Sequence, residues 1–139
     1  MTSESLKRAA ADSNVILSAV IGKAALRIFV RPELELITTQ FNLQEVEEYL
    51  PRLAQKYRLD ERALFWQLKM LPIHVFAEKY YKSHLEKAER LLSGRDPDDI
   101  HLLALALKES IPIWSNDHDF EKLSIPVYTT AKFLKALEG

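Results

Sequence analysis

Apolar residues along this sequence follow two spacings, one of two residues and one of three to four residues. The two-residue spacing and short apolar runs are typical of strands. They predict strands at residues 8–12, 34–38, 72–76, 111–115 and 125–128. The longer spacing predicts a helix that begins at Asn42 and further helices over residues 13–29, 59–70, 78–92, 100–109 and 131–137. Because strands alternate with helices, the pattern predicts an α/β fold with a parallel sheet and helices on both faces.

Composition narrows the class of protein. The 139 residues fit one domain, residues 1–139, and 47% hydrophobic residues are enough for one core. A net charge of -1 excludes a chain that binds nucleic acid by bulk electrostatics alone. The absence of Cys excludes disulfide scaffolds, thiol catalysis and thiolate zinc sites. Neither a signal peptide nor a membrane span is evident, so we expect a cytoplasmic protein that does not enter a membrane.

Four acidic residues from distant parts of the sequence are expected at one edge of this sheet. Asp12 ends the first strand, and Asp117 follows the fourth strand by two residues. Glu45 lies in the first turn of the helix after the second strand, and Asp99 opens the helix before the fourth. Ligands of open parallel sheets bind outside the carboxyl ends of the strands. The pattern therefore predicts a crevice lined by carboxylates.

Such a crevice indicates a divalent cation. Neighbouring carboxylates disfavour joint ionisation, and Mg²⁺ or Mn²⁺ relieves the repulsion because it prefers oxygen ligands. The same ion lowers the pKa of bound water and neutralises an approaching phosphate. Carboxylates without a His or Cys requirement are typical of metal-dependent phosphodiester hydrolysis.

Ordinary structural roles compete with this interpretation. Asp96 before Pro97, with a carboxylate at Asp99, is also a common helix start, so the metal ligand among Asp96, Asp98 and Asp99 stays open. Glu45 is three residues after Asn42, where a capping box places its acid. The aromatic residues expected in the core or at a dimer face, rather than at a base-stacking site, are Tyr49, Phe65 and Trp66.

Four motifs together resemble the PIN domain family. They are Asp12-Ser13-Asn14-Val15, Glu45 after Thr38-Thr39, Arg95-Asp96-Pro97-Asp98-Asp99, and Trp114-Ser115-Asn116-Asp117-His118-Asp119-Phe120. The family groups small metal-dependent ribonucleases, among them VapC-like toxins of toxin–antitoxin pairs. The resemblance implies a three-layer α/β/α sandwich around a central, mostly parallel sheet, with a helical insert at about residues 42–70.

By this resemblance, the catalytic residues are Asp12, Glu45, Asp99 and Asp117. Asp12, Asp99 and Asp117 are expected to hold Mg²⁺ or Mn²⁺, while Glu45 positions water or a second ion. The residues expected to orient these ligands or contact substrate are Asn14, Asp96, Ser115, Asn116 and Asp119. Arg95 and Lys122 are candidates for binding RNA phosphates.

The expected partners are an RNA substrate and a small antitoxin protein that covers the crevice, and a homodimer is compatible with the family. The alternative is a catalytically silent module that binds nucleic acid or a partner protein. A phosphoacceptor receiver domain is set aside because the third strand is followed by Ala77-Glu78 rather than by Asp.

Overall fold

The computed structural model describes residues 6–93 and 96–138, and its centre is a five-stranded sheet in which every strand pairing is parallel. The spatial order of the strands is β3-β2-β1-β4-β5. Their bounds are β1 Arg8–Ala11, β2 Glu35–Thr39, β3 Ile73–Phe76, β4 Ile113–Trp114 and β5 Val127–Tyr128. The predicted α/β class and parallel sheet are confirmed.

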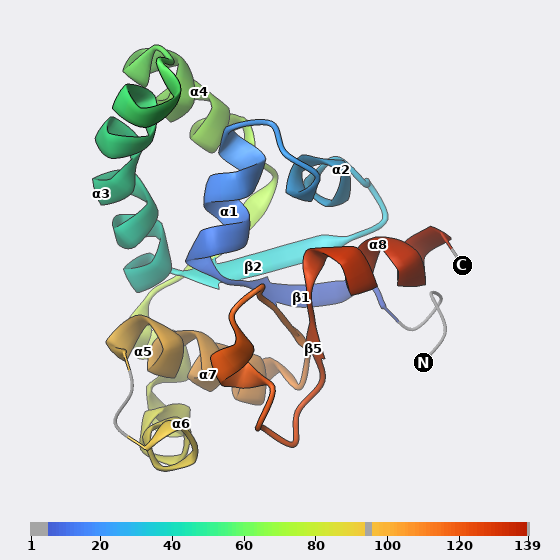
Figure 1. The fold of residues 1–139 in the computed structure, drawn as a ribbon. Coiled ribbons are helices and arrows are strands. Elements are labelled where there is room, and N and C mark those ends of the chain that lie inside the picture. The colour runs from blue at the N-terminus through green and yellow to red at the C-terminus, as the bar shows by residue number, and fades with distance from the viewer. Residues whose placement is uncertain (1–5, 94–95, 139) are drawn as a thin grey trace.

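Helices cover both faces of the sheet, as Figure 1 shows. One layer holds α1 Ser13–Val20, α2 Ala25–Phe29, α3 Gln40–Tyr57, α4 Glu61–Met70 and α8 Thr130–Glu138. The other holds α5 Glu78–Tyr81, the short 3-10 helix Lys82–His84, α6 Leu85–Leu92 and α7 Pro97–Glu109. A second 3-10 helix, His118–Phe120, follows β4. The expected three-layer sandwich is therefore confirmed.

The core divides into two parts because neighbouring residues of a strand point to opposite faces. Ala9 and Ala11 of β1 face the α1 side, where Trp114 packs 5.1 Å from Phe29 and 5.2 Å from Phe133 between ring centroids. Ala10 faces α7 on the other side. Small side chains on the central strand let both helical layers approach the sheet closely.

Several predicted elements differ from the structure. The helix predicted over residues 13–29 is two helices, because the chain turns through Gly22 at a φ of 80° and brings α2 back onto α1. The helix over 78–92 is interrupted by the 3-10 helix Lys82–His84, because the backbone of Tyr81 has a φ of -113° and a ψ of 11°, outside the α-helical region. The strand at 72–76 is not buried, because β3 is at the edge of the sheet and pairs with β2 alone.

The start of α3 is also corrected. Thr39, not Asn42, caps this helix: the Thr39 hydroxyl oxygen accepts a hydrogen bond from the Asn42 N–H at 3.0 Å. Glu45 is therefore not the acid of a capping box. The segment expected as a helical insert corresponds to α3 and α4, which pack against each other and against α1. In the described part of the chain, no helix combines the length and hydropathy needed to cross a membrane.

Candidate metal centre

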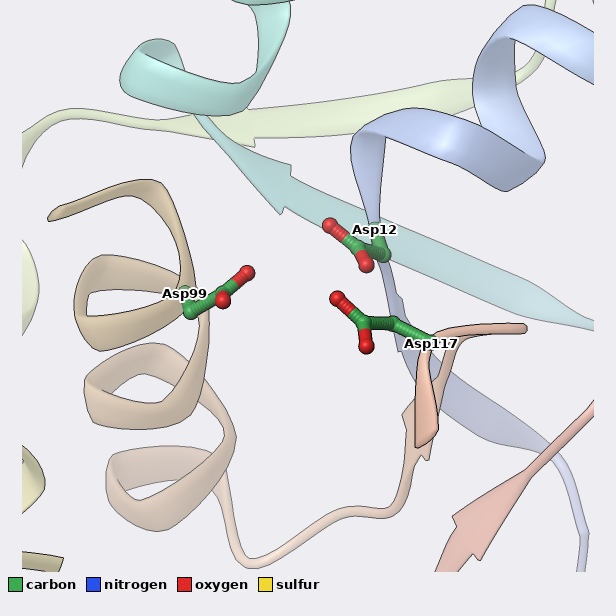
Figure 2. A group of neighbouring side chains, drawn as sticks. All are labelled: Asp12, Asp99 and Asp117. Atoms are coloured by element: carbon green, nitrogen blue, oxygen red, sulfur yellow. The ribbon is translucent and has the colours of Figure 1, made fainter. Parts of the chain in front are cut away.

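Three of the four predicted acids converge at the carboxyl edge of the sheet. Asp12 follows β1, Asp117 follows β4, and Asp99 is the third residue of α7. Figure 2 shows their carboxylates directed toward one another, and one oxygen of each lies within 4.8 Å of the others. Three elements that are distant in sequence thus bring oxygen donors to a single point.

Asp12 is the most buried of these acids, with 5% of its surface exposed. It also caps α1, since its Oδ1 accepts a hydrogen bond from the Ser13 N–H at 2.8 Å. Its Oδ2 accepts bonds from the Ser115 hydroxyl at 2.6 Å and the Asn14 amide at 3.3 Å. Burial raises the pKa of Asp12 to about 6, although these hydrogen bonds from Ser115 and Ser13 act in the opposite direction.

Ser115 connects Asp12 to Asp117. Because Ala11 pairs with Trp114 in the sheet, the next residues, Asp12 and Ser115, lie side by side. The Ser115 hydroxyl donates to Asp12 and accepts from the Asp117 N–H at 3.0 Å. The Asp117 carboxylate in turn accepts from the Asp119 N–H at 2.8 Å, which begins the 3-10 helix. The loop after β4 is thereby held against Asp12.

The three candidate acids at the start of α7, Asp96, Asp98 and Asp99, have different surroundings. Asp96 caps the helix by accepting a hydrogen bond from the Asp98 N–H at 2.9 Å. Asp99 is half-buried and belongs to the group with Asp12 and Asp117. Burial raises its pKa to about 7, with repulsion from Asp12 and then Asp117 as the next causes.

Glu45 lies in a second acidic group rather than with those three. Oxygens of Glu45, Asp96 and Asp98 lie within 4.8 Å of one another. Burial is the main cause that raises the pKa of Asp98, followed by a hydrogen bond with Glu45. A hydrogen bond between two carboxyl groups requires a proton on one of them, in line with the raised pKa of Asp98.

Members of both acidic groups line one pocket of about 320 Å³: the three acids of the first group, and Glu45 and Asp96 of the second. Six carboxylates line it together with four other side chains: Ser13, Asn14, Leu17 and Tyr49. The buried Oδ1 of Asn14 has no hydrogen-bond partner among the described residues. Oxygen donors, raised carboxyl pKa values and an unsatisfied amide oxygen fit a hard divalent cation such as Mg²⁺ or Mn²⁺.

The remaining predicted residues have different surroundings. Asp119 lines the pocket, whereas the Asn116 side chain accepts a hydrogen bond from the Thr130 N–H and holds α8 instead. Lys122 is exposed beyond the 3-10 helix, and Arg95 lies outside the described residues. Tyr49 was expected in the core or at a dimer face rather than at a substrate site, but it is 44% exposed and lines the pocket. Its position four residues after Glu45, which places both on one face of the helix, is the signal that could have indicated this.

Comparisons with known proteins agree with this architecture. A toxin–antitoxin complex from Klebsiella pneumoniae superposes with a TM-score of 0.63 at 17% identity, covering 88% of this chain and 97% of that one. VapBC2 from Rickettsia felis, bound to a DNA fragment from its promoter, superposes with a TM-score of 0.65 at 14% identity. The match covers 88% of this chain and 98% of that one. No curated protein is similar enough in sequence to count as a relative. The sequence model described as PIN domain matches residues 11–138, so the chain belongs to the PIN domain family.

Proposed function

We propose that this protein is a metal-dependent ribonuclease that hydrolyses RNA phosphodiester bonds. The observation that carries the proposal is the convergence of Asp12, Asp99 and Asp117 within 4.8 Å, with the pKa values of Asp12 and Asp99 raised. Such a group is electrostatically unfavourable without a cation. Family membership supports nuclease chemistry at this site.

Each group in the pocket has a defined task in this proposal. Asp12, Asp99 and Asp117 hold Mg²⁺ or Mn²⁺, while Asn14 and Ser115 orient the Asp12 carboxylate. When bound, the ion acts as a Lewis acid toward water and neutralises the charge of the phosphate. Glu45 also lines the pocket, where its carboxylate would position water or a second ion.

The biological role we propose is the toxin of a toxin–antitoxin pair. Both solved structures named above are toxin–antitoxin complexes, and each is covered almost completely by this chain. The corresponding partner is a small antitoxin that covers the acidic pocket. This role places the protein in the cytoplasm with its RNA substrate, and it is compatible with a homodimer.

The test is cleavage of a fluorescently labelled RNA in Mn²⁺ by the parent protein and by Asp12→Asn. Asn also serves as a helix N-cap, so this variant keeps the cap while weakening the metal site. Asp60→Asn is the matched control, because Asp60 caps α4 and is exposed away from the pocket. We expect cleavage by the parent and Asp60→Asn, and its loss in Asp12→Asn and in EDTA.

Cleavage by Asp12→Asn at the parent rate would refute the site assignment. If the parent protein is folded and binds RNA in Mn²⁺ without cutting it, the proposed ribonuclease activity is refuted. That result would support the alternative, a catalytically silent module that binds nucleic acid.

A further inference from the structure

We propose that Tyr49 is a substrate-contacting residue, against which an RNA base stacks when the neighbouring phosphate occupies the acidic pocket. The inference rests on the proposed function and deepens it, since it assigns the part of the substrate that lies beside the reacting phosphate. It starts from the pocket lining, which combines charged carboxylates with apolar side chains.

Carboxylates and an apolar wall line the pocket together. The carboxylates lie at the end of β1, in α3, at the start of α7 and in the loop after β4, whereas the wall consists of Leu17 from α1 and Tyr49 from α3. Among the described residues that line the pocket, Tyr49 is the one aromatic residue. A nucleotide has the same asymmetry, because its phosphate is charged and its base has an apolar face.

Tyr49 is exposed although the helix around it is packed. Val46 and Leu50 are completely buried in the core, whereas 44% of the Tyr49 surface is exposed. The ring is therefore at the border of the apolar stripe of α3, one helical turn from Glu45. An exposed aromatic ring in a nucleic-acid site offers a stacking surface that accepts any base.

Arg52 supplies a positive charge beside this wall. Its guanidinium carbon lies 5.5 Å from the centroid of the Tyr49 ring, in a cation–π contact that restrains the ring. None of the described residues that line the pocket is a Lys or Arg. The exposed Arg52 is thus placed to attract the phosphate that follows the stacked base.

Other exposed aromatic residues lack this placement. Tyr57 lies on the same helix, is 40% exposed and has Lys23 and Lys56 over its ring, but it does not line the acidic pocket. It differs from Tyr49 mainly in position, which makes Tyr57→Ala a matched control.

The experiment measures binding of a 5′-labelled RNA hexanucleotide by fluorescence anisotropy. Ca²⁺ replaces Mn²⁺ to slow cleavage, since it takes the same oxygen ligands. Removing one base–aromatic stack is expected to raise the Kd for Tyr49→Ala roughly 5- to 150-fold. We expect Tyr49→Trp and Tyr57→Ala to remain within about twofold of the parent, because an aromatic ring is still present at position 49.

Two further readouts separate stacking from a structural effect. RNA with abasic sites should bind the parent and Tyr49→Ala equally, since no base is left to stack. In Mn²⁺, Tyr49→Ala should raise KM with kcat nearly unchanged, as expected for a contact made equally in ground and transition states.

Equal Kd values for Tyr49→Ala and Tyr57→Ala, or no RNA binding by the parent, would overturn the inference. If the parent cleaves RNA and Tyr49→Ala matches it, the stacking contact fails while the proposed function stands. If RNA binding depends on Tyr49 but Mn²⁺ produces no cleavage, the stacking contact is supported and the proposed ribonuclease activity is refuted.

Discussion

At the scale of single residues, the Ser115 hydroxyl determines how the two proposed metal ligands Asp12 and Asp117 lie relative to each other. It donates to Asp12 and accepts from the Asp117 N–H, and it is almost completely buried. Replacing a group that orients a ligating carboxylate typically weakens metal binding about 10- to 100-fold. Ser115 also lowers the pKa of Asp12, so it keeps that carboxylate available to a cation near neutral pH.

Ser115→Ala is therefore expected to weaken Mn²⁺ binding about 10- to 100-fold, as measured by titration calorimetry. Thr38→Val is the control: Thr38 is a buried hydroxyl on the neighbouring strand that donates to the Ala11 carbonyl rather than to a carboxylate. This control should lose stability but keep the parent affinity for Mn²⁺. Equal affinities in both variants would contradict a positioning role for Ser115.

The convergence of Asp12, Asp99 and Asp117 was more predictable than the surroundings of Glu45. Asp12 and Asp117 follow strands, and the ends of parallel strands meet at one edge whatever the details of packing. The partners of Glu45 were not predictable, because they depend on the rotational phase of α3. That phase is set by the Thr39 cap, three residues earlier than the cap inferred from sequence.

At the scale of elements, a buried hydrogen-bond network joins the starts of α1 and α3. The Asn42 amide donates to the Ser13 hydroxyl at 3.0 Å, and its oxygen accepts from the Thr39 hydroxyl at 2.6 Å. Ser13 also donates to the Asn42 carbonyl at 3.3 Å. These contacts hold Glu45, one turn further along α3, across the pocket from Asp12.

Asn42→Ala should lower the free energy of unfolding by about 2–4 kcal/mol, because it leaves the buried Ser13 and Thr39 hydroxyls without these partners. Urea unfolding measures the change. Gln55→Ala, an exposed substitution on the same helix, should stay within about 0.5 kcal/mol of the parent. A loss below about 1 kcal/mol for Asn42→Ala would show that the network does not join the two helices.

The spacing of apolar residues predicted the strands and most helices, but it did not predict where helices are interrupted. The apolar pattern continues through residues 13–29, although the chain turns at Gly22 with a φ of 80° and so divides this segment into α1 and α2. Conversely, α3 continues through Pro51, because that residue lies on the exposed side of the helix. Local pattern alone does not distinguish these two cases.

At the scale of the whole molecule, the acidic pocket opposes folding when no cation is bound. Asp12 and Asp99 have pKa values of about 6 and about 7, against about 3.9 for an unfolded Asp. At pH values between the unfolded and folded pKa values, the folded state binds more protons than the unfolded state. The free energy of unfolding must therefore fall as pH rises from about 4 to above 7, and the buried Asp12 alone contributes on the order of 3 kcal/mol to this fall.

A bound cation should offset this loss of stability. Mn²⁺ binds ionised carboxylates of the folded state, so its stabilising effect grows with pH and reaches about 2.7 kcal/mol at a hundredfold excess over Kd. Thermal unfolding from pH 5 to 8, in EDTA and in Mn²⁺, measures both effects. Asp99→Asn should be more stable than the parent in EDTA at pH 8 and gain little from Mn²⁺, whereas Asp60→Asn should follow the parent. A parent that Mn²⁺ does not stabilise at pH 8 would mean that the acids of this fold serve only as helix caps and turns.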